Sequence, residues 1–168
     1  MLKIRTKTNP RRLRLVGLII LALILSACAA KLPDISEYGD TPIEISGLID
    51  EEFTITPNEL AKLDITDLSA TGATAKAGTV SGVGVTLITF LAQYGKTPAD
   101  FKYIRFIAAD EYRITLSGAK HTDDAVLLAI AGKDKPLAPG ERPLRLIIPD
   151  AESSQWIYSV VRIEFVPN

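Results

Sequence analysis

Cysteine, histidine, methionine and tryptophan are almost absent from this sequence, which has one residue of each. The single cysteine, Cys28, excludes an intramolecular disulfide, so packing alone must hold the fold together. The single histidine, His121, excludes a metal centre built from several imidazoles. Because His121 is followed by the polar stretch 122–124, we expect it to be a solvated loop residue. The residues therefore predict no metal site.

Basic residues are also scarce after the N-terminal segment. Six of the 19 lysines and arginines precede Cys28, whereas all 20 aspartates and glutamates follow it, which leaves a formal charge of −7 from Cys28 onward. An acidic domain argues against binding to nucleic acid and against electrostatic attraction to anionic lipid.

The motifs of common catalytic loops are missing as well. There is no G-x-S-x-G turn and no Walker loop, and the glycines at 82 and 84 lack the third glycine of a dinucleotide loop. Five carboxylates fall at predicted turns, where acidic side chains are usually solvated: Asp110, Glu111, Asp123, Asp124 and Asp150. The sequence therefore predicts no catalytic residue.

The N-terminus does carry the pattern of an export signal. Its first 14 residues hold six basic and no acidic side chains, and an apolar stretch of 11 residues follows from Leu15 to Leu25. A membrane-spanning helix needs about 20 apolar residues. Residues 1–27 are therefore predicted to be a secretory signal peptide, and the alternative is an uncleaved anchor helix.

The end of this signal is Leu25-Ser26-Ala27-Cys28, which resembles the lipobox of bacterial lipoproteins. The resemblance implies that Cys28 is acylated and becomes the mature N-terminus. Several acyl chains hold a protein stably on a bilayer. We therefore expect an extracytoplasmic protein that is lipid-anchored to a bacterial membrane through Cys28.

Two regions follow the predicted signal. Residues 28–42 contain prolines, Gly39 and acidic side chains without periodicity, which is typical of a lipidated tether. The alternative is an ordered arm that packs on the domain. Residues 43–168 are long enough for one domain.

This domain is predicted to be α+β, with mixed β-sheets and a few short helices. Thr56, Pro57 and Glu59 form a capping box that predicts a short helix ending near Leu63, and a second, amphipathic helix is expected at 87–94. Ile65 to Val85 favours a β-hairpin. Alternating or continuous apolar residues predict the other strands, at 43–46, 53–55, 103–108, 112–116, 125–131, 145–148 and 161–165.

Six short motifs in this domain carry a family resemblance. They are Ile45-Ser46-Gly47 with Glu59-Leu60, Gly82–Leu87, Ala108–Tyr112, Val126–Ala129, Gly140–Pro149, and Trp156 with Val161–Glu164. In this order they resemble the molybdopterin-binding oxidoreductase domain of the sulfite oxidase superfamily. The resemblance implies that family's fold.

The resemblance also implies a molybdenum cofactor, which enzymes of the family bind through a cysteine thiolate. The corresponding stretch here, 63–81, offers only hydroxyls, such as Ser69, Thr71 and Ser81, and these are poor substitutes on a soft-ligand site. A glycine of the family's turn motif is replaced by Glu111. We therefore expect no cofactor, and molybdopterin is implied by the resemblance alone.

These observations predict a non-catalytic domain that binds a small ligand or an envelope protein. The candidate ligand-binding residues are Tyr112, Arg113, Arg142, Arg145 and Trp156. A small-ligand site should appear as an apolar pocket with a few polar groups, and a protein-binding site as an exposed apolar patch. For Tyr112 and Trp156 the alternative is a place in the core, and for Arg145 it is an ion pair with Asp150 or Glu141. The alternative function is a molybdopterin-dependent oxidoreductase with an atypical metal site.

Overall fold

The computed structural model describes residues 30–73, 78–122 and 126–168. The predicted signal peptide, the predicted acylation site Cys28 and the acidic residues 123 and 124 lie outside these ranges. The elements in chain order are β1 (Ile43–Ser46), β2 (Phe53–Ile55), α2 (Pro57–Leu60), β3 (Thr66–Thr71), β4 (Thr79–Thr86), α3 (Leu87–Ala92), η1 (Pro98–Asp100), β5 (Phe101–Ala108), β6 (Arg113–Ser117), η2 (Gly118–Lys120), β7 (Leu127–Ala131), η3 (Pro139–Glu141), β8 (Arg145–Ile147), η4 (Ser153–Gln155) and β9 (Val160–Pro167).

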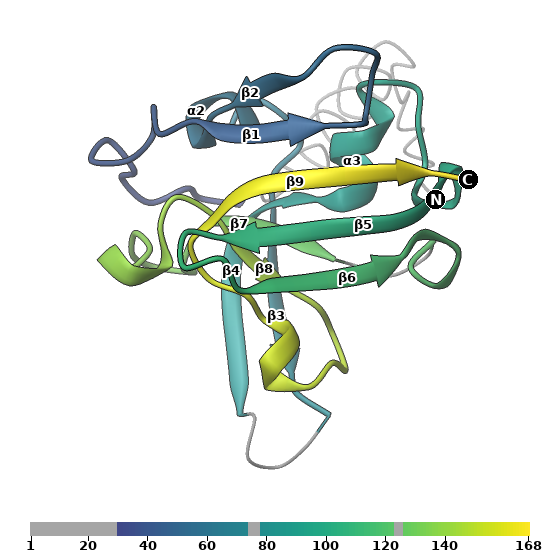
Figure 1. The fold of residues 1–168 in the computed structure, drawn as a ribbon. Coiled ribbons are helices and arrows are strands. Elements are labelled where there is room, and N and C mark those ends of the chain that lie inside the picture. Colours follow the sequence, from purple (N-terminus) through teal and green to yellow (C-terminus); the bar gives the residue numbers. More distant parts are fainter. Residues whose placement is uncertain (1–29, 74–77, 123–125) are drawn as a thin grey trace, which may run out of the picture.

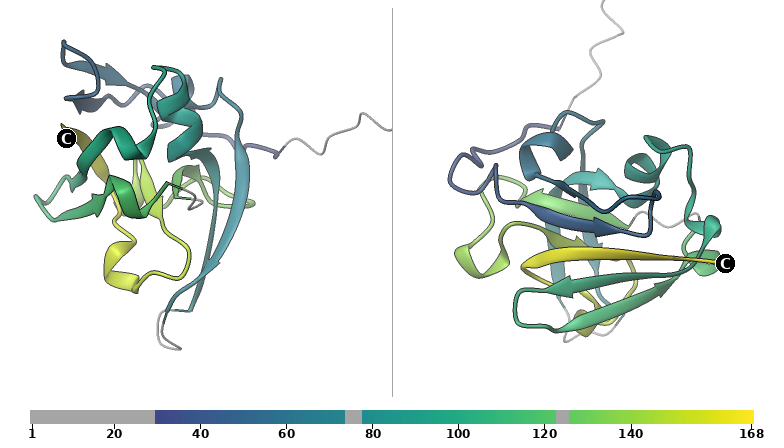
Figure 2. Two further views of the ribbon diagram at one scale, coloured as in Figure 1. Left: turned by 90° about the vertical axis from the view of Figure 1, so that its right-hand side faces the viewer. Right: turned by 45° about the horizontal axis from the view of Figure 1, so that its top comes forward.

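The strands form two sheets, and this confirms the predicted α+β class. One sheet has the order β2-β1-β9-β5-β6 and faces the viewer in Figure 1, whereas β3-β4-β7-β8 form the second sheet. The first and last strands, β1 and β9, pair in parallel, with Ile45 opposite Ile163. The β3–β4 hairpin extends beyond the rest of the domain, as Figures 1 and 2 show.

A single apolar core joins the two sheets. Ile45, Phe106 and Phe165 contribute to it from the first sheet, and Val85 and Ile130 from the second. All five residues of β7 are buried, as the continuous apolar run in the sequence predicted. In the part of the chain that the structure describes, no helix is long and apolar enough to cross a membrane.

Both helices begin where their capping residues predicted. The Thr56 hydroxyl accepts a hydrogen bond from the Glu59 N–H, and the Glu59 carboxylate accepts one from the Thr56 N–H. Thr86 caps α3 in the same position, through the Thr89 N–H. The first helix ends at Leu60, about one turn earlier than expected.

The segment before β1 differs from the predicted tether. Residues 30–42 form an ordered arm, in which Ile35 and Tyr38 are buried in the core. The Tyr38 hydroxyl donates to the Ile130 carbonyl at 2.7 Å and accepts from the Leu137 N–H at 3.0 Å. The prediction of a flexible tether is thus wrong for this part. Its contacts are isolated rather than periodic, so they leave no pattern in the sequence.

Burial changes the pKa of one residue of the arm, Tyr38. Desolvation raises the pKa of Tyr38, and the hydrogen bond from Leu137 together with the nearby Arg142 guanidinium opposes that rise. The same guanidinium lies 4.7 Å from the centre of the Tyr38 ring, and it binds the Glu37 carboxylate at 2.6 Å. Arg142 therefore fastens the arm to the domain.

Candidate functional site

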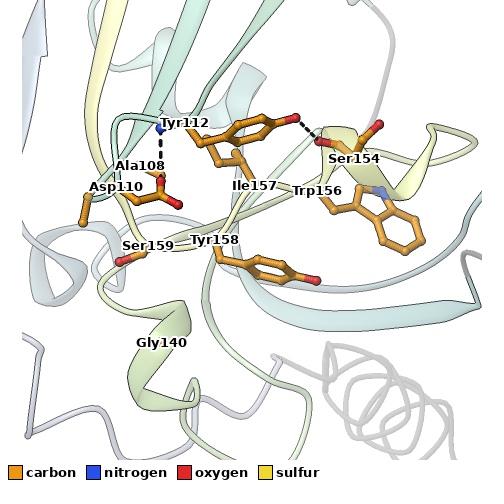
Figure 3. Close-up of a pocket in the computed structure, with 10 residues that line it drawn as sticks. Ala108, Asp110, Tyr112, Gly140, Ser154, Trp156, Ile157, Tyr158 and Ser159 are labelled. Carbon is orange, nitrogen blue, oxygen red and sulfur yellow. Dashed lines mark hydrogen bonds between the residues drawn. The ribbon is translucent and has the colours of Figure 1, made fainter.

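A pocket of about 440 Å³ opens beside the turn between β5 and β6. Its walls come from that turn, from η3, and from η4 with the chain that leads to β9 (Figure 3). The lining residues are Ala108, Ala109, Asp110, Tyr112, Gly140, Ser154, Trp156, Ile157, Tyr158 and Ser159. The pocket therefore contains two of the five sequence-predicted residues, Tyr112 and Trp156.

The first wall is a tight turn that fixes an acid and an aromatic ring. The Asp110 carboxylate accepts a hydrogen bond from the Tyr112 N–H at 3.0 Å, and Glu111 between them has a φ of 65°. A left-handed conformation favours glycine, which explains why the family's turn motif has glycine at this position. The Tyr112 hydroxyl donates to the Ser154 carbonyl at 3.0 Å. Tyr112 thus reaches across the pocket while its side chain stays 50% exposed.

The second wall is the segment that leads into β9. Trp156 is 3% exposed, and its indole N–H donates to the Ile148 carbonyl at 2.7 Å. Two residues later Tyr158 is 44% exposed and flanks the pocket. The Ala109 N–H donates to the Ser159 carbonyl at 2.9 Å, which ties the two walls together. Trp156 therefore belongs both to the core and to the pocket lining.

Arg145 contacts the pocket residue Tyr158, whose hydroxyl accepts a hydrogen bond from the Arg145 Nη2 atom at 3.4 Å, but Arg145 does not itself line the pocket. Its guanidinium binds the Glu141 carboxylate at 2.8 Å, one of the two partners the sequence offered. The guanidinium also lies 4.5 Å from the centre of the Tyr158 ring, and its Nε is buried without a hydrogen-bond partner among the described residues. Arg145 is therefore held by an acid and an aromatic ring.

The other two candidate arginines, Arg142 and Arg113, make contacts outside the pocket. Arg142 holds the arm through Glu37 and Tyr38, and it also donates to the Leu137 carbonyl at 2.9 Å. Arg113 is exposed on the edge strand β6, 4.0 Å from the Glu111 carboxylate. Neither arginine lines the pocket.

The charge of the pocket comes from an acidic side chain and not from the candidate arginines. Among the described lining residues Asp110 has the only carboxylate, and there is no lysine, arginine or histidine. The sequence predicts Asp110 at a turn without a role, and it carries no signal that marks Tyr158 as a pocket residue. Their juxtaposition depends on how the β5–β6 turn meets the chain before β9, which no local pattern encodes.

Comparisons with known proteins identify relatives of this fold. The profile of the oxidoreductase molybdopterin binding domain matches residues 30–168. The solved structure of the sulfane dehydrogenase SoxCD from Paracoccus pantotrophus matches with a TM-score of 0.63 and 22% sequence identity, over 83% of this chain and 40% of that one. At that identity the likeness concerns the fold alone, and the chain spans less than half of that relative. No curated protein matches the sequence.

The residues present do not fit the molybdenum cofactor of this family. Across the β3–β4 hairpin the Thr71 and Thr79 hydroxyls face each other at 3.3 Å and are exposed, and the described part of 63–81 contains no thiol. No three histidine, cysteine or acidic side chains gather as a metal site within the described ranges. The described lining of the pocket also offers no lysine, arginine or histidine side chain that could hold a pterin phosphate.

Proposed function

We propose that this chain, which belongs to the family of oxidoreductase molybdopterin binding domains, uses the fold of that family for binding rather than for catalysis. In this proposal the protein is an exported lipoprotein, and its domain binds a small ligand in the pocket lined by Tyr112 and Tyr158. The signal pattern of residues 1–27 and the lipobox-like sequence before Cys28 support the anchor.

The observation that carries this proposal is the composition of the pocket wall. Aromatic and aliphatic side chains dominate it, and a few polar groups converge on it, which is the usual make-up of a small-molecule site. The arginines that could hold a phosphate are already engaged by Glu37 and Glu141. A wall of this kind suits a ligand without phosphate.

Exposed apolar side chains support a ligand more than an envelope partner. Five large hydrophobic side chains are exposed in the described residues, and two of them, Tyr112 and Tyr158, belong to the pocket. The others are Ile49, Ile88 and Tyr103, and they lie on the loop after β1, on α3 and on β5. The pocket is therefore the better supported binding site.

Family membership favours a second candidate, an oxidoreductase that holds molybdopterin at an atypical site. Such an enzyme would bind its metal without a protein thiolate, because residues 29–168 contain no cysteine. The two candidates differ in one measurable property, the cofactor content of the protein.

The test is metal and pterin analysis of the full chain, produced in a host that makes and loads molybdenum cofactor. A member of the family that contains the ligand cysteine, produced in the same host, serves as the control. We expect stoichiometric molybdenum and pterin in the control and neither in this protein. Stoichiometric molybdenum with pterin in this protein would reject the binding proposal and establish the oxidoreductase.

A further inference from the structure

We infer that the pocket selects a small organic cation, such as a primary or quaternary ammonium compound. This inference rests on the proposed function, because it names the class of ligand for the same pocket. Three features support the inference: the negative charge of the pocket wall, the two exposed tyrosine rings, and the neutralisation of Arg145 by Glu141 beside Tyr158.

The carboxylate of Asp110 gives the pocket its sign. Its Oδ1 atom accepts the Tyr112 N–H at 3.0 Å, and this bond fixes the carboxylate at one end of the pocket (Figure 3). An ionised carboxylate has acceptor sites on both oxygens, so Asp110 can still interact with a ligand. Since the described lining residues include no cation, an anionic ligand would be repelled there and a cationic one attracted.

The tyrosine rings supply faces that attract cations. Figure 3 shows the Tyr112 and Tyr158 rings on either side of Ile157, between the Asp110 end and Trp156. The hydrogen bond from Tyr112 to the Ser154 carbonyl keeps that ring in place, so a ligand does not have to order it. A cation within about 6 Å of an aromatic centroid is attracted by the ring quadrupole.

The Tyr158 ring already makes one cation–π contact within the protein, with Arg145. The Arg145 guanidinium lies 4.5 Å from the centre of the ring, and its side chain is only 13% exposed. The Glu141 carboxylate at 2.8 Å compensates its charge, so Arg145 does not make the pocket positive. The described wall therefore combines the Asp110 carboxylate, the Tyr112 ring, and the Tyr158 ring beside the neutralised Arg145–Glu141 pair, which favours a cation over a neutral ligand of the same shape.

The test compares two probes of equal shape and different charge. Choline is the cation, and 3,3-dimethylbutan-1-ol is its neutral isostere. Each is titrated into the isotopically labelled full chain in detergent micelles, and binding is followed through the backbone amide shifts of the pocket residues. We expect choline to shift the amides of Tyr112 and Tyr158, and the isostere to bind at least about fivefold more weakly.

Two variants locate the effect. Asp110→Asn removes the charge but keeps an acceptor for the Tyr112 N–H, and it should weaken choline binding about threefold. Asp134→Asn makes the same charge change on an exposed residue that does not line this pocket, and it should leave binding unchanged. Added salt should weaken choline binding to the unmodified protein and leave the isostere unaffected.

The outcomes separate this inference from the proposed function. If the isostere binds as tightly as choline and Asp110→Asn has no effect, the pocket binds neutral ligands, and the cation inference is overturned while the binding function stands. If neither probe shifts the pocket amides, the cation inference is also overturned. The proposed function itself is rejected only by molybdenum and pterin in the cofactor analysis.

Discussion

Replacing Tyr38 by phenylalanine tests whether the N-terminal arm is part of the folded domain. The change keeps the buried ring and removes the hydroxyl that bonds the Ile130 carbonyl and the Leu137 N–H. A buried hydrogen bond contributes about 0.5–1.5 kcal/mol net, and a buried group left without its partner costs about 1–3 kcal/mol. We therefore expect Tyr38→Phe to lower the free energy of unfolding by about 2–4 kcal/mol.

The measurement is equilibrium unfolding in urea, followed by the fluorescence of Trp156. Trp156 is the only tryptophan and is 3% exposed, so its emission reports loss of the core. The midpoint should fall while the slope with denaturant stays the same. The control is Tyr103→Phe on β5, where the side chain is exposed and the change should stay within about 0.5 kcal/mol. A Tyr38→Phe midpoint equal to that of the control would refute the reasoning and return the arm to the status of a tether.

Two further predictions concern the backbone and pH. Gly47 has a φ of +70°, and a Cβ there would lie 1.9 Å from the Phe165 carbonyl oxygen, so Gly47→Ala should cost about 4 kcal/mol or more in urea unfolding. Gly95 has a φ of +64° with open space around it, so Gly95→Ala should cost only about 1–2 kcal/mol, and equal losses would contradict the clash. The raised pKa of Tyr38 predicts stability that is complete below about pH 10 and falls as pH rises through the folded-state pKa. Unfolding free energies at about pH 9 and about pH 11 should therefore differ less in Tyr38→Phe than in the unmodified protein; an unchanged difference would show that Tyr38 does not contribute.

The elements of the fold could be predicted because their signals are local. The capping residues Thr56 and Thr86 mark the helix starts, and the apolar run before Gly132 marks the buried strand β7. The family motifs placed the whole domain, and the profile match confirms that resemblance. These patterns lie within a few residues of the structure that they specify.

The site could be predicted only in part, because its contacts join distant segments. Tyr112 and Trp156 were found through family motifs, and the structure brings both to one pocket. Arg142 and Arg145 lie in the family motif Gly140–Pro149, but the charge of each is neutralised within the protein, by Glu37 and Glu141 respectively. Whether a guanidinium faces a ligand or an acid depends on a partner that can lie 105 residues away, as Glu37 does from Arg142.

The ordered arm limits the distance between the domain and the proposed lipid anchor at Cys28. Ala30 and Leu32 already pack against the core, and only Ala29 separates Cys28 from Ala30. Two extended residues span about 7 Å at most. An acylated Cys28 would therefore hold the domain close to the lipid headgroups, as a long linker would not. At about one Debye length from the bilayer, an acidic domain feels the surface charge of the membrane.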